Sequence, residues 1–367
     1  MNTVLLATLV TAAISAVLAA LLVLAERYLA NYGTCTIDIN QGAKRLDVEG
    51  GKPLLATLTD QQIFIPSACG GRGTCAYCKL KVLDGGGPVG PTELTLLSDD
   101  EQKANVRISC QLKVRNDLAI EIPDELFKVR QFTGTVERIR DLTHDIKELR
   151  IRLVEPDTID FTPGQYIQLE APAYGDNPEP VYRAYSISSP PSDAHHVEMI
   201  IRLVPGGICT TWVFTLLKEG DTVRLNGPYG EFRLSDDPSK PMVWIAGGSG
   251  MAPFWSIVRH MREHHIERPC TYFFGAVAPR DLFLVDELKQ LESELPGFRF
   301  VPALSGAEAD GWTGEKGLIT EVVARHLTDG SNAEGYLCGS GGMIDASVKV
   351  LAAKGIPEAR IYYDKFT

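Results

Sequence analysis

The hydrophobic and polar positions along the chain change their pattern several times, which divides the sequence into parts. An uncharged run of 22 residues, from Val4 to Ala25, stands first. From Gly33 to Phe127, short alternating runs such as Cys35–Ile39 and Cys78–Leu83 predict short strands. Longer alternating runs follow, and from about Ser239 strand-like runs alternate with helical ones. The pattern predicts an apolar segment followed by three folded domains.

The first apolar run is long enough to cross a membrane. A helix of this length would span about 33 Å, which matches the hydrocarbon core of a bilayer. A cleaved signal peptide is the alternative, but it normally has a basic leader and a shorter apolar stretch. Basic residues near the run, Arg27, Lys44 and Arg45, all follow it. This bias predicts a single-pass anchor in the inner membrane, with the soluble domains on the cytoplasmic side.

Composition and charge narrow the possible functions of the remaining chain. The 367 residues are 44% hydrophobic and carry a formal net charge of −11, so nucleic-acid binding through a basic surface is not expected. Eight cysteines are too few for a disulfide-built scaffold of this length. Three of them, however, fall within ten residues, which directs attention to metal chemistry.

The clustered cysteines are Cys69, Cys75 and Cys78, spaced C-x5-C-x2-C, and a fourth follows at Cys110. Four thiolates can hold the two irons of a [2Fe-2S] cluster, and the glycines at 70, 71 and 73 let the backbone wrap closely. Zinc also accepts four cysteines, but structural zinc usually pairs two close hooks. Three clustered ligands and one distant cysteine favour the iron–sulfur interpretation over zinc or a set of buried thiols.

This segment resembles the [2Fe-2S] ferredoxin family, whose fold is a β-grasp sheet crossed by a helix. The resemblance implies that Cys69, Cys75, Cys78 and Cys110 are the cluster ligands. The first gap of five residues differs from the gap of four in plant-type ferredoxins. It matches ferredoxin domains fused to reductases and the vertebrate-type relatives.

Beyond Phe127, longer alternating runs such as Glu148–Leu153 and Tyr166–Leu169 are separated by Pro-Gly and Gly-Pro turns, which predicts an antiparallel β-barrel. The run Arg183-Ala184-Tyr185-Ser186 brings a cation, an aromatic ring and a hydroxyl together on one expected strand. The run Pro205–Trp212 is a glycine turn leading into an expected helix, whose first amides could hold a pyrophosphate.

In this order, the two runs resemble the FAD domain of the ferredoxin–NADP reductase superfamily. The resemblance implies that Arg183 pairs with the flavin phosphates and that Tyr185 lies against the isoalloxazine ring. Ser186 would hydrogen-bond near the reactive N5, while Gly207 and Thr210 would cap the pyrophosphate. Thr210 stands where serine is commoner in the superfamily.

The last third of the chain predicts a parallel α/β sheet. A strand is expected over Met242–Ala246, a helix over Pro253–His264 and a strand over Thr271–Gly275. The turn between the first two, Gly247–Pro253, is typical of a phosphate-binding strand-to-helix turn. Its GGSGMAP sequence resembles the corresponding turn of the same superfamily, which implies that Gly248, Ser249 and Gly250 contact NAD.

A second glycine turn, Cys338-Gly339-Ser340, ends a later expected strand. The resemblance implies that Cys338 lies beside the nicotinamide and assists hydride transfer, that Gly339 contacts the cofactor, and that Phe366 shields the flavin. Ser340 replaces a proline common in the family. No Ser-Arg pair of the kind that binds a 2′-phosphate follows the second strand, which favours NADH over NADPH.

The predicted fold class is a multidomain combination of α+β and α/β parts. It comprises a transmembrane helix with linker (1–32), a β-grasp [2Fe-2S] ferredoxin domain (33–127), an FAD-binding antiparallel β-barrel (128–237) and a parallel α/β NAD(P)H-binding domain (238–367). This order resembles the family of F subunits of sodium-translocating NADH:quinone oxidoreductases. The resemblance implies electron flow from NADH to FAD, to the cluster, to other membrane subunits and ultimately to quinone. Catalytic roles would fall to Tyr185, Ser186 and Cys338.

Two alternatives remain open at this point. Residues 183–190 read RAYSISSP, as in many soluble reductases, whereas the F subunits typically have an AYSMAN-like run. The chain could therefore be a membrane-tethered, NADH-dependent reductase component of an oxygenase or another redox enzyme. It could also be an accessory or redox-sensing subunit without turnover. The presence of Arg183, Tyr185, Ser186, Gly248 and Cys338 argues against that.

Overall fold

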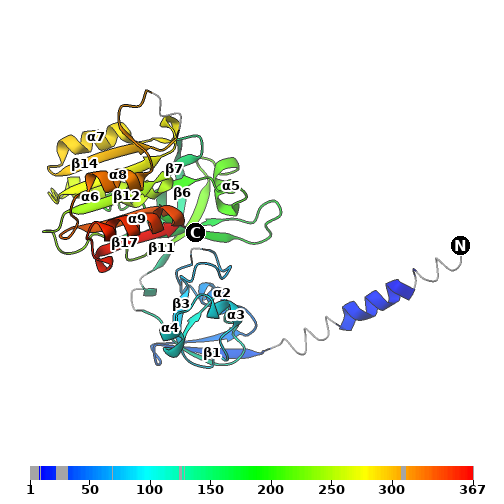
Figure 1. Ribbon diagram of the computed structural model, residues 1–367. Helices are drawn as coiled ribbons and strands as arrows, with labels where there is room; N and C mark the ends of the chain where they lie inside the picture. The colour runs from blue at the N-terminus through cyan, green and yellow to red at the C-terminus, as the bar shows by residue number, and fades with distance from the viewer. Residues whose placement is uncertain are drawn as a thin grey trace. The chain divides into compact units, whose positions relative to one another are not determined.

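The computed structural model describes Thr8 and residues 10–21, 32–67, 69–123, 126–127, 129–306 and 311–366. The chain divides into two compact units. The first comprises Met1–Ser67 and Gly71–Lys128, and the second comprises Ala68–Gly70 and Val129–Thr367. Each unit is described by itself below (Figure 1).

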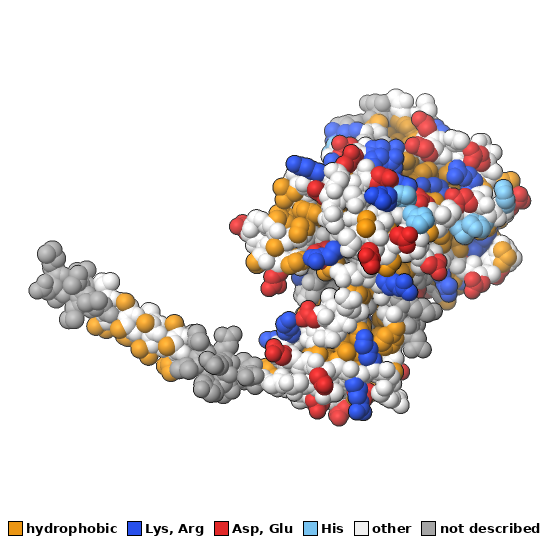
Figure 2. All heavy atoms as spheres, turned by 180° about the vertical axis from the view of Figure 1, so that it is seen from behind, with side chains coloured by type: hydrophobic (Ala, Val, Ile, Leu, Met, Phe, Trp, Pro, Cys, Tyr) orange, Lys and Arg blue, Asp and Glu red, His pale blue; other side chains and the backbone are white. Residues whose placement is uncertain are grey.

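The amino-terminal segment is described only in its middle part. Residues 10–21 are helical, and their apolar side chains, including Val10, Ile14 and Leu18, are exposed (Figure 2). The predicted span over residues 4–25 extends outside the described residues at both ends. Within the described part of the chain, no helix combines the length and the apolar character needed to cross a membrane.

The first unit is built on a five-stranded sheet with the order β2-β1-β5-β3-β4. Strands β1 and β5 are parallel, and the other pairs are antiparallel. The strands are β1 (Thr34–Ile39), β2 (Lys44–Glu49), β3 (Lys79–Asp84), β4 (Val106–Ile108) and β5 (Leu118–Glu121), and the helices are α2 (Leu54–Asp60), α3 (Pro91–Leu94) and α4 (Asp99–Lys103). Leu54 and Leu58 of α2 are fully buried in one core with Ile37 and Ile120, as expected for a helix that packs on a β-grasp sheet.

The first half of the second unit is an antiparallel barrel, as the sequence predicted. Its strands are β6 (Arg130–Asp141), β7 (Ile146–Glu155), β8 (Tyr166–Ala171), β9 (Val181–Ser186), β10 (His196–Arg202) and β11 (Thr222–Tyr229), and α5 (Ile208–Thr215) follows β10. They pair in the order β10-β7-β6-β11-β8-β9. A bridge between Ile187 and Met199 joins the two edge strands and closes the barrel.

The second half is a parallel sheet with the order β15-β14-β13-β12-β16-β17. Its strands are β12 (Met242–Gly247), β13 (Cys270–Ala276), β14 (Phe298–Leu304), β15 (Glu315–Lys316), β16 (Glu334–Ser340) and β17 (Ile361–Phe366). Its helices are α6 (Met251–Glu263), α7 (Val285–Glu294), α8 (Ile319–His326) and α9 (Gly341–Ala353). From β12 the chain first builds one side of the sheet with β13, β14 and β15, and then the other side with β16 and β17. The strand order therefore reverses between β12 and β16, which is where open α/β sheets bind ligands.

Two apolar cores hold helices on opposite faces of this sheet (Figure 1). On one face, Trp244 of β12 stacks on Phe254 of α6 with ring centroids 5.0 Å apart, and Leu288 of α7 joins the same core. On the other face, Ile245 packs with residues of α8 and α9. This layered packing holds the carboxyl-terminal ends of β12 and β16 side by side at the same end of the sheet.

Candidate functional site

In the first unit, residues 71–78 of the cysteine loop lie close to the segment that carries Cys110. Gly71 and Gly73 have left-handed φ values of 86° and 73°. A Cβ added to Gly71 would lie 4.0 Å from the Cβ of Cys110, and one added to Gly73 would lie 2.5 Å from Nε2 of Gln111. Glycine is favoured at position 73 because its left-handed φ of 73° strains other residues.

The structure brings the sulfurs of Cys78 and Cys110 together. A hydrogen bond between the two thiols, together with burial, raises the pKa of Cys78 above its usual value. Gln111 donates from Nε2 to Sγ of Cys110 across 3.4 Å. Among the described residues, no three Cys, His, Asp or Glu side chains converge on one metal position. The paired sulfurs of Cys78 and Cys110 beside a glycine-rich loop are a donor set that fits an iron–sulfur cluster, and the full set of four ligands stays a prediction.

A buried ion pair fixes the backbone that leads to Cys110. Arg107 donates from Nε and Nη2 to the two carboxylate oxygens of Glu93, at 2.9 and 2.6 Å. Oε1 of Glu93 also accepts from the amide of Ile108 at 3.0 Å. Both side chains are almost fully buried, so the pair holds the chain two residues before Cys110 in one conformation.

In the second unit, β9 presents the flavin motif at the edge of the barrel. The strand ends at Ser186, which is buried, whereas Arg183 and Tyr185 are half-buried. Tyr185 shares a hydrogen bond with the Cys209 thiol in the first turn of α5. Burial raises the pKa of Tyr185 well above its usual value and that of Cys209 to about 11, so both keep their protons at neutral pH.

The helix expected after the glycine turn is α5, and Gly207 is its N-cap without a side-chain cap. Oγ1 of Thr210 lies 3.2 Å from the amide of Val204, so this hydroxyl holds the turn. A Cβ on Gly207 would lie 2.6 Å from that same Oγ1. The amides of the first turn of α5 have no acceptor within the helix, which fits an anionic pyrophosphate at this end.

The two glycine turns of the parallel sheet are in contact at the point where the strand order reverses. Gly248 to Gly250 form a 3-10 turn between β12 and α6. A Cβ on Gly250 would lie 2.2 Å from the carbonyl oxygen of Cys338 and 3.1 Å from Cα of Gly339. The structure therefore brings together two turns that lie about 90 residues apart in the sequence, and their bare backbone leaves a cradle that suits a dinucleotide phosphate.

Asp364 joins Ser186 and Cys338 in one cluster, and the sequence motifs gave no sign of it. Strand β17 places Asp364 beside Cys338 in the sheet register. The Ser186 hydroxyl donates to Oδ2 of Asp364 at 3.3 Å. Burial raises the pKa of Asp364 to about 6, and it raises the pKa of the fully buried Cys338 thiol well above its usual value. A hydroxyl, a thiol and a carboxyl group that titrates near neutrality thus meet between the barrel and the sheet.

Arg202 is a second residue that the sequence motifs missed. It ends β10, and its Nε donates to Oδ2 of Asp145 at 2.7 Å. A Cβ on Gly248 would lie 3.2 Å from Nη1 of Arg202, so the guanidinium lies against the dinucleotide turn. Phe366, by contrast, is 38% exposed at the end of β17, and its predicted position over the flavin stays a prediction.

Three family models match successive parts of the chain. They are a 2Fe-2S iron-sulfur cluster binding domain over residues 37–115, an oxidoreductase FAD-binding domain over 133–234 and an oxidoreductase NAD-binding domain over 244–349. The F subunit of the Na(+)-translocating NADH-quinone reductase of Neisseria meningitidis is 35% identical over 391 aligned positions, which cover 95% of this chain and 96% of the relative. The chain belongs to the family of these F subunits.

Solved structures that align with most of this chain support this assignment of the fold. A cytochrome P450 reductase from Amycolatopsis is 30% identical, with a TM-score of 0.74, and covers 91% of this chain and 99% of its own. A ferredoxin reductase in carbazole 1,9a-dioxygenase is 27% identical, with a TM-score of 0.70 and the same coverage. This member of the family of F subunits is an oxidoreductase whose cofactors are a [2Fe-2S] cluster, FAD and NAD(H).

The raised pKa of Asp364 predicts a pH dependence in both stability and rate. An unfolded aspartate titrates near 4 and the folded one near 6, so the stability linked to its neutral form is present below about pH 4 and is lost as the pH rises through 6. We expect Asp364→Asn to unfold at a higher temperature than wild type at pH 8 and at nearly the same temperature at pH 4. We also expect the rate of flavin reduction by NADH to lose its inflection near pH 6.

The matched control for that experiment is Asp345→Asn, because Asp345 is an exposed carboxylate on α9 that pairs with Lys365 at 2.7 Å. It should keep both the wild-type inflection and the wild-type difference in unfolding temperature between the two pH values. If Asp364→Asn retained the inflection, Asp364 would not be the titrating group. Stopped-flow absorbance and thermal unfolding at each pH provide the two measurements.

Proposed function

We propose that this chain is the electron-input subunit of a membrane redox complex. It oxidises NADH and passes the electrons through FAD and the [2Fe-2S] cluster to other membrane subunits, with quinone as the eventual acceptor and sodium as the translocated ion. Bound FAD would supply hydride acceptance from NADH and one-electron donation to the cluster. The observation that carries the proposal is the similarity to the F subunits across 95% of the chain, together with the meeting of Ser186, Cys338 and the dinucleotide turn at one place.

Each predicted residue has a proposed task within this activity. Gly248, Ser249, Gly250 and Gly339 bind the dinucleotide, and Arg202 adds a cation beside their turn. Cys338 packs against the nicotinamide, and the Ser186 hydroxyl orients the reactive edge of the flavin through its bond with Asp364.

The flavin itself is held by residues of the barrel and of the last strand. Arg183 and the first turn of α5, with Gly207 and Thr210, hold the flavin phosphates. Tyr185 and Phe366 cover its ring. The proposed cluster ligands are Cys69, Cys75, Cys78 and Cys110.

The proposal includes the layout of the chain and its place in the cell. Residues 1–32 contain a single-pass anchor in the inner membrane, and the domains follow at 33–127, 128–237 and 238–367 on the cytoplasmic side. The uncharged run from Val4 to Ala25 and the basic residues that follow it support this arrangement.

A second candidate is a reductase component of an oxygenase. Two observations favour it: the RAYSISSP sequence of residues 183–190, and the similarity over 91% of the chain to reductases whose names include cytochrome P450 and carbazole 1,9a-dioxygenase. The two candidates share their cofactors and differ in the protein that receives the electrons.

Turnover and partner capture together test these proposals. The purified, cofactor-loaded chain should reduce ferricyanide with NADH, and it should do so much faster with NADH than with NADPH. Extraction of native membranes with mild detergent should recover the chain with further integral membrane subunits. A chain lacking residues 1–32 should leave the membrane fraction and keep its NADH oxidation.

Each measurement has an outcome that counts against the proposal. Failure of the FAD-loaded protein to reduce ferricyanide would leave an accessory or sensing role as the better interpretation. Recovery with a soluble oxygenase alone would establish the second candidate. A truncated chain that stayed in the membrane fraction when produced without its partner subunits would exclude residues 1–32 as the anchor.

A further inference from the structure

Helix α6 connects the dinucleotide turn directly to the strand end that carries Ser186. The helix starts at Met251, next to the glycine turn, and its middle reaches the barrel. There the hydroxyl of Ser256 donates to the carbonyl oxygen of Ser189 at 2.6 Å. One turn later, Nη2 of Arg259 donates to the carbonyl oxygen of Ser188. Consecutive turns of one helix thus hold consecutive carbonyls of the segment that follows Ser186.

The segment that receives these bonds is fully buried and hydrogen-bonded to β10. Ser188 and Ser189 have no exposed surface. The amide of Ser188 donates to the carbonyl of Glu198 at 2.8 Å, and the amide of Glu198 donates to Oγ of Ser189 at 3.2 Å. Ile187 bridges to Met199 and lies directly after Ser186. A displacement of the segment would therefore move Ser186 with it.

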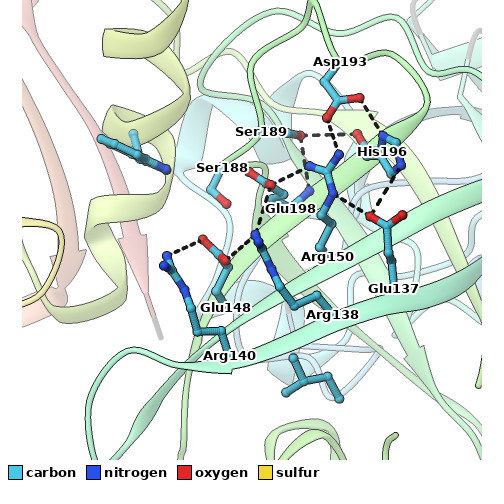
Figure 3. Close-up of polar contacts among 12 residues, drawn as sticks. Glu137, Arg138, Arg140, Glu148, Arg150, Ser188, Ser189, Asp193, His196 and Glu198 are labelled. Carbon is cyan, nitrogen blue, oxygen red and sulfur yellow. Dashed lines mark hydrogen bonds and ion pairs between the residues drawn. The ribbon is translucent and has the colours of Figure 1, made fainter. Parts of the chain in front are cut away.

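Glu198 completes the connection as a buried carboxylate that pairs with Arg150 of the barrel and with Arg259 of the helix. Figure 3 shows the barrel side of this arrangement. Oε1 of Glu198 lies 2.6 Å from Nη1 of Arg150 on β7, and its Oε2 lies 2.8 Å from Nη2 of Arg259. Burial alone would raise the pKa of Glu198, but Arg259 and Arg150 outweigh it and lower that pKa, so the carboxylate is ionised at neutral pH.

Arg150 itself is tied into the barrel by other carboxylates. It lies 2.7 Å from Glu137 and 2.8 Å from Asp193, and Figure 3 shows these side chains converging on its guanidinium. The barrel side of the connection is thus fixed independently of α6. Arg259, whose guanidinium lies 4.9 Å from the Trp255 ring centroid, joins the helix to this network through Glu198.

We propose that Arg259 is a positioning residue for hydride transfer, because it holds the Ser186 strand end in register with the helix that begins at the dinucleotide turn. The inference rests on the proposed binding of flavin at Ser186 and of nicotinamide at the turn. Hydride transfer needs the two reacting atoms within about 3–3.5 Å, and a misplacement of about 1 Å can lower the rate roughly 100-fold. A guanidinium that bonds both Ser188 and Glu198 fixes this spacing where a single bond would not.

The variants Arg259→Met and Arg259→Lys test the proposal in the full, cofactor-loaded chain. Methionine keeps an apolar stem over Trp255, and Glu198 stays paired with Arg150, so the fold should survive. We expect the rate of flavin reduction at saturating NADH to fall about 10- to 100-fold in Arg259→Met, with KM for NADH changed less than about two-fold. Arg259→Lys, which can hold one partner only, should fall between this variant and wild type.

A spectroscopic readout separates positioning from a general loss of structure. The long-wavelength absorption that arises when nicotinamide stacks on flavin should weaken in Arg259→Met while FAD content stays at the wild-type level. The control is Arg262→Met on the same helix, because Arg262 is exposed and lies 3.8 Å from Glu294. That control should keep the wild-type rate and absorption.

The outcomes distinguish this inference from the proposed function. An Arg259→Met protein with the wild-type rate and absorption would overturn the inference while NADH oxidation by the wild type stands. A change in KM alone would also overturn it, since it would assign Arg259 to binding. If Arg259→Met failed to hold FAD, Arg259→Lys would decide, because wild-type absorption and rate in that variant would overturn the inference. A wild-type chain whose FAD is not reduced by NADH contradicts the proposed function itself.

Discussion

Replacing Cys75 with alanine should remove the visible absorbance and the low-temperature EPR signal of the cluster while leaving flavin reduction by NADH near its wild-type rate. Cys75 lies on the glycine-rich loop and is only half-buried, so the smaller side chain leaves no large cavity in the core. Alanine has no sulfur that could bind iron, and a four-sulfur site that loses one ligand does not hold its irons. The iron–sulfur, FAD and NAD models match separate parts of the chain, so only electron transfer beyond the flavin should fail.

The matched control for this variant is Cys35→Ala in the same domain. Cys35 is a buried residue of β1 whose Sγ lies 3.7 Å from the carbonyl oxygen of Tyr32. The Cys35→Ala substitution should lower the free energy of unfolding without loss of iron, because Cys35 lies outside the cysteine loop. A full iron and sulfide content in Cys75→Ala would remove Cys75 from the ligand set. Loss of flavin reduction as well would contradict the independence of the domains.

The domain order and the individual motifs could be predicted from the sequence because each is local. The glycine turn after β12, for example, follows from an apolar strand, a run of glycines and a helical pattern within about 20 residues. The contact between Gly250 and Cys338 could not be predicted in this way. It depends on β16 lying next to β12, which is a property of the whole sheet.

Asp364 shows the same limit more sharply. A single aspartate in a terminal strand has no neighbours in sequence that mark it as functional. Only the parallel pairing of β17 with β16, and the ending of β9 at Ser186, place its carboxyl group beside a hydroxyl and a thiol. Arg202 was missed for the same reason, because its partner Gly248 lies in the other half of the unit.

Gly250→Ala should reduce the rate of flavin reduction by NADH about 100-fold and weaken NADH binding, with FAD content unchanged. The φ of Gly250 is −61°, so the backbone conformation itself would accept alanine. The obstacle is the Cβ, which would lie 2.2 Å from the carbonyl oxygen of Cys338, an atom of the neighbouring backbone that cannot rotate away. The dinucleotide turn and the Cys338 turn must separate, which opens the cradle proposed to hold the phosphates.

Gly342→Ala supplies the comparison that isolates this contact. Gly342 lies in the first turn of α9, and an added Cβ there meets nothing within 4 Å. Alanine should stabilise that helix by about 0.5–1 kcal/mol, whereas overpacking at Gly250 should cost about 1–3 kcal/mol. The two substitutions add the same methyl group near the same strand end. We expect opposite changes in unfolding temperature, and slow flavin reduction in Gly250→Ala alone. That result would assign the effect to the contact between position 250 and the Cys338 carbonyl. Equal NADH affinity and rate in the two variants would show that the turn after β12 does not bind the dinucleotide.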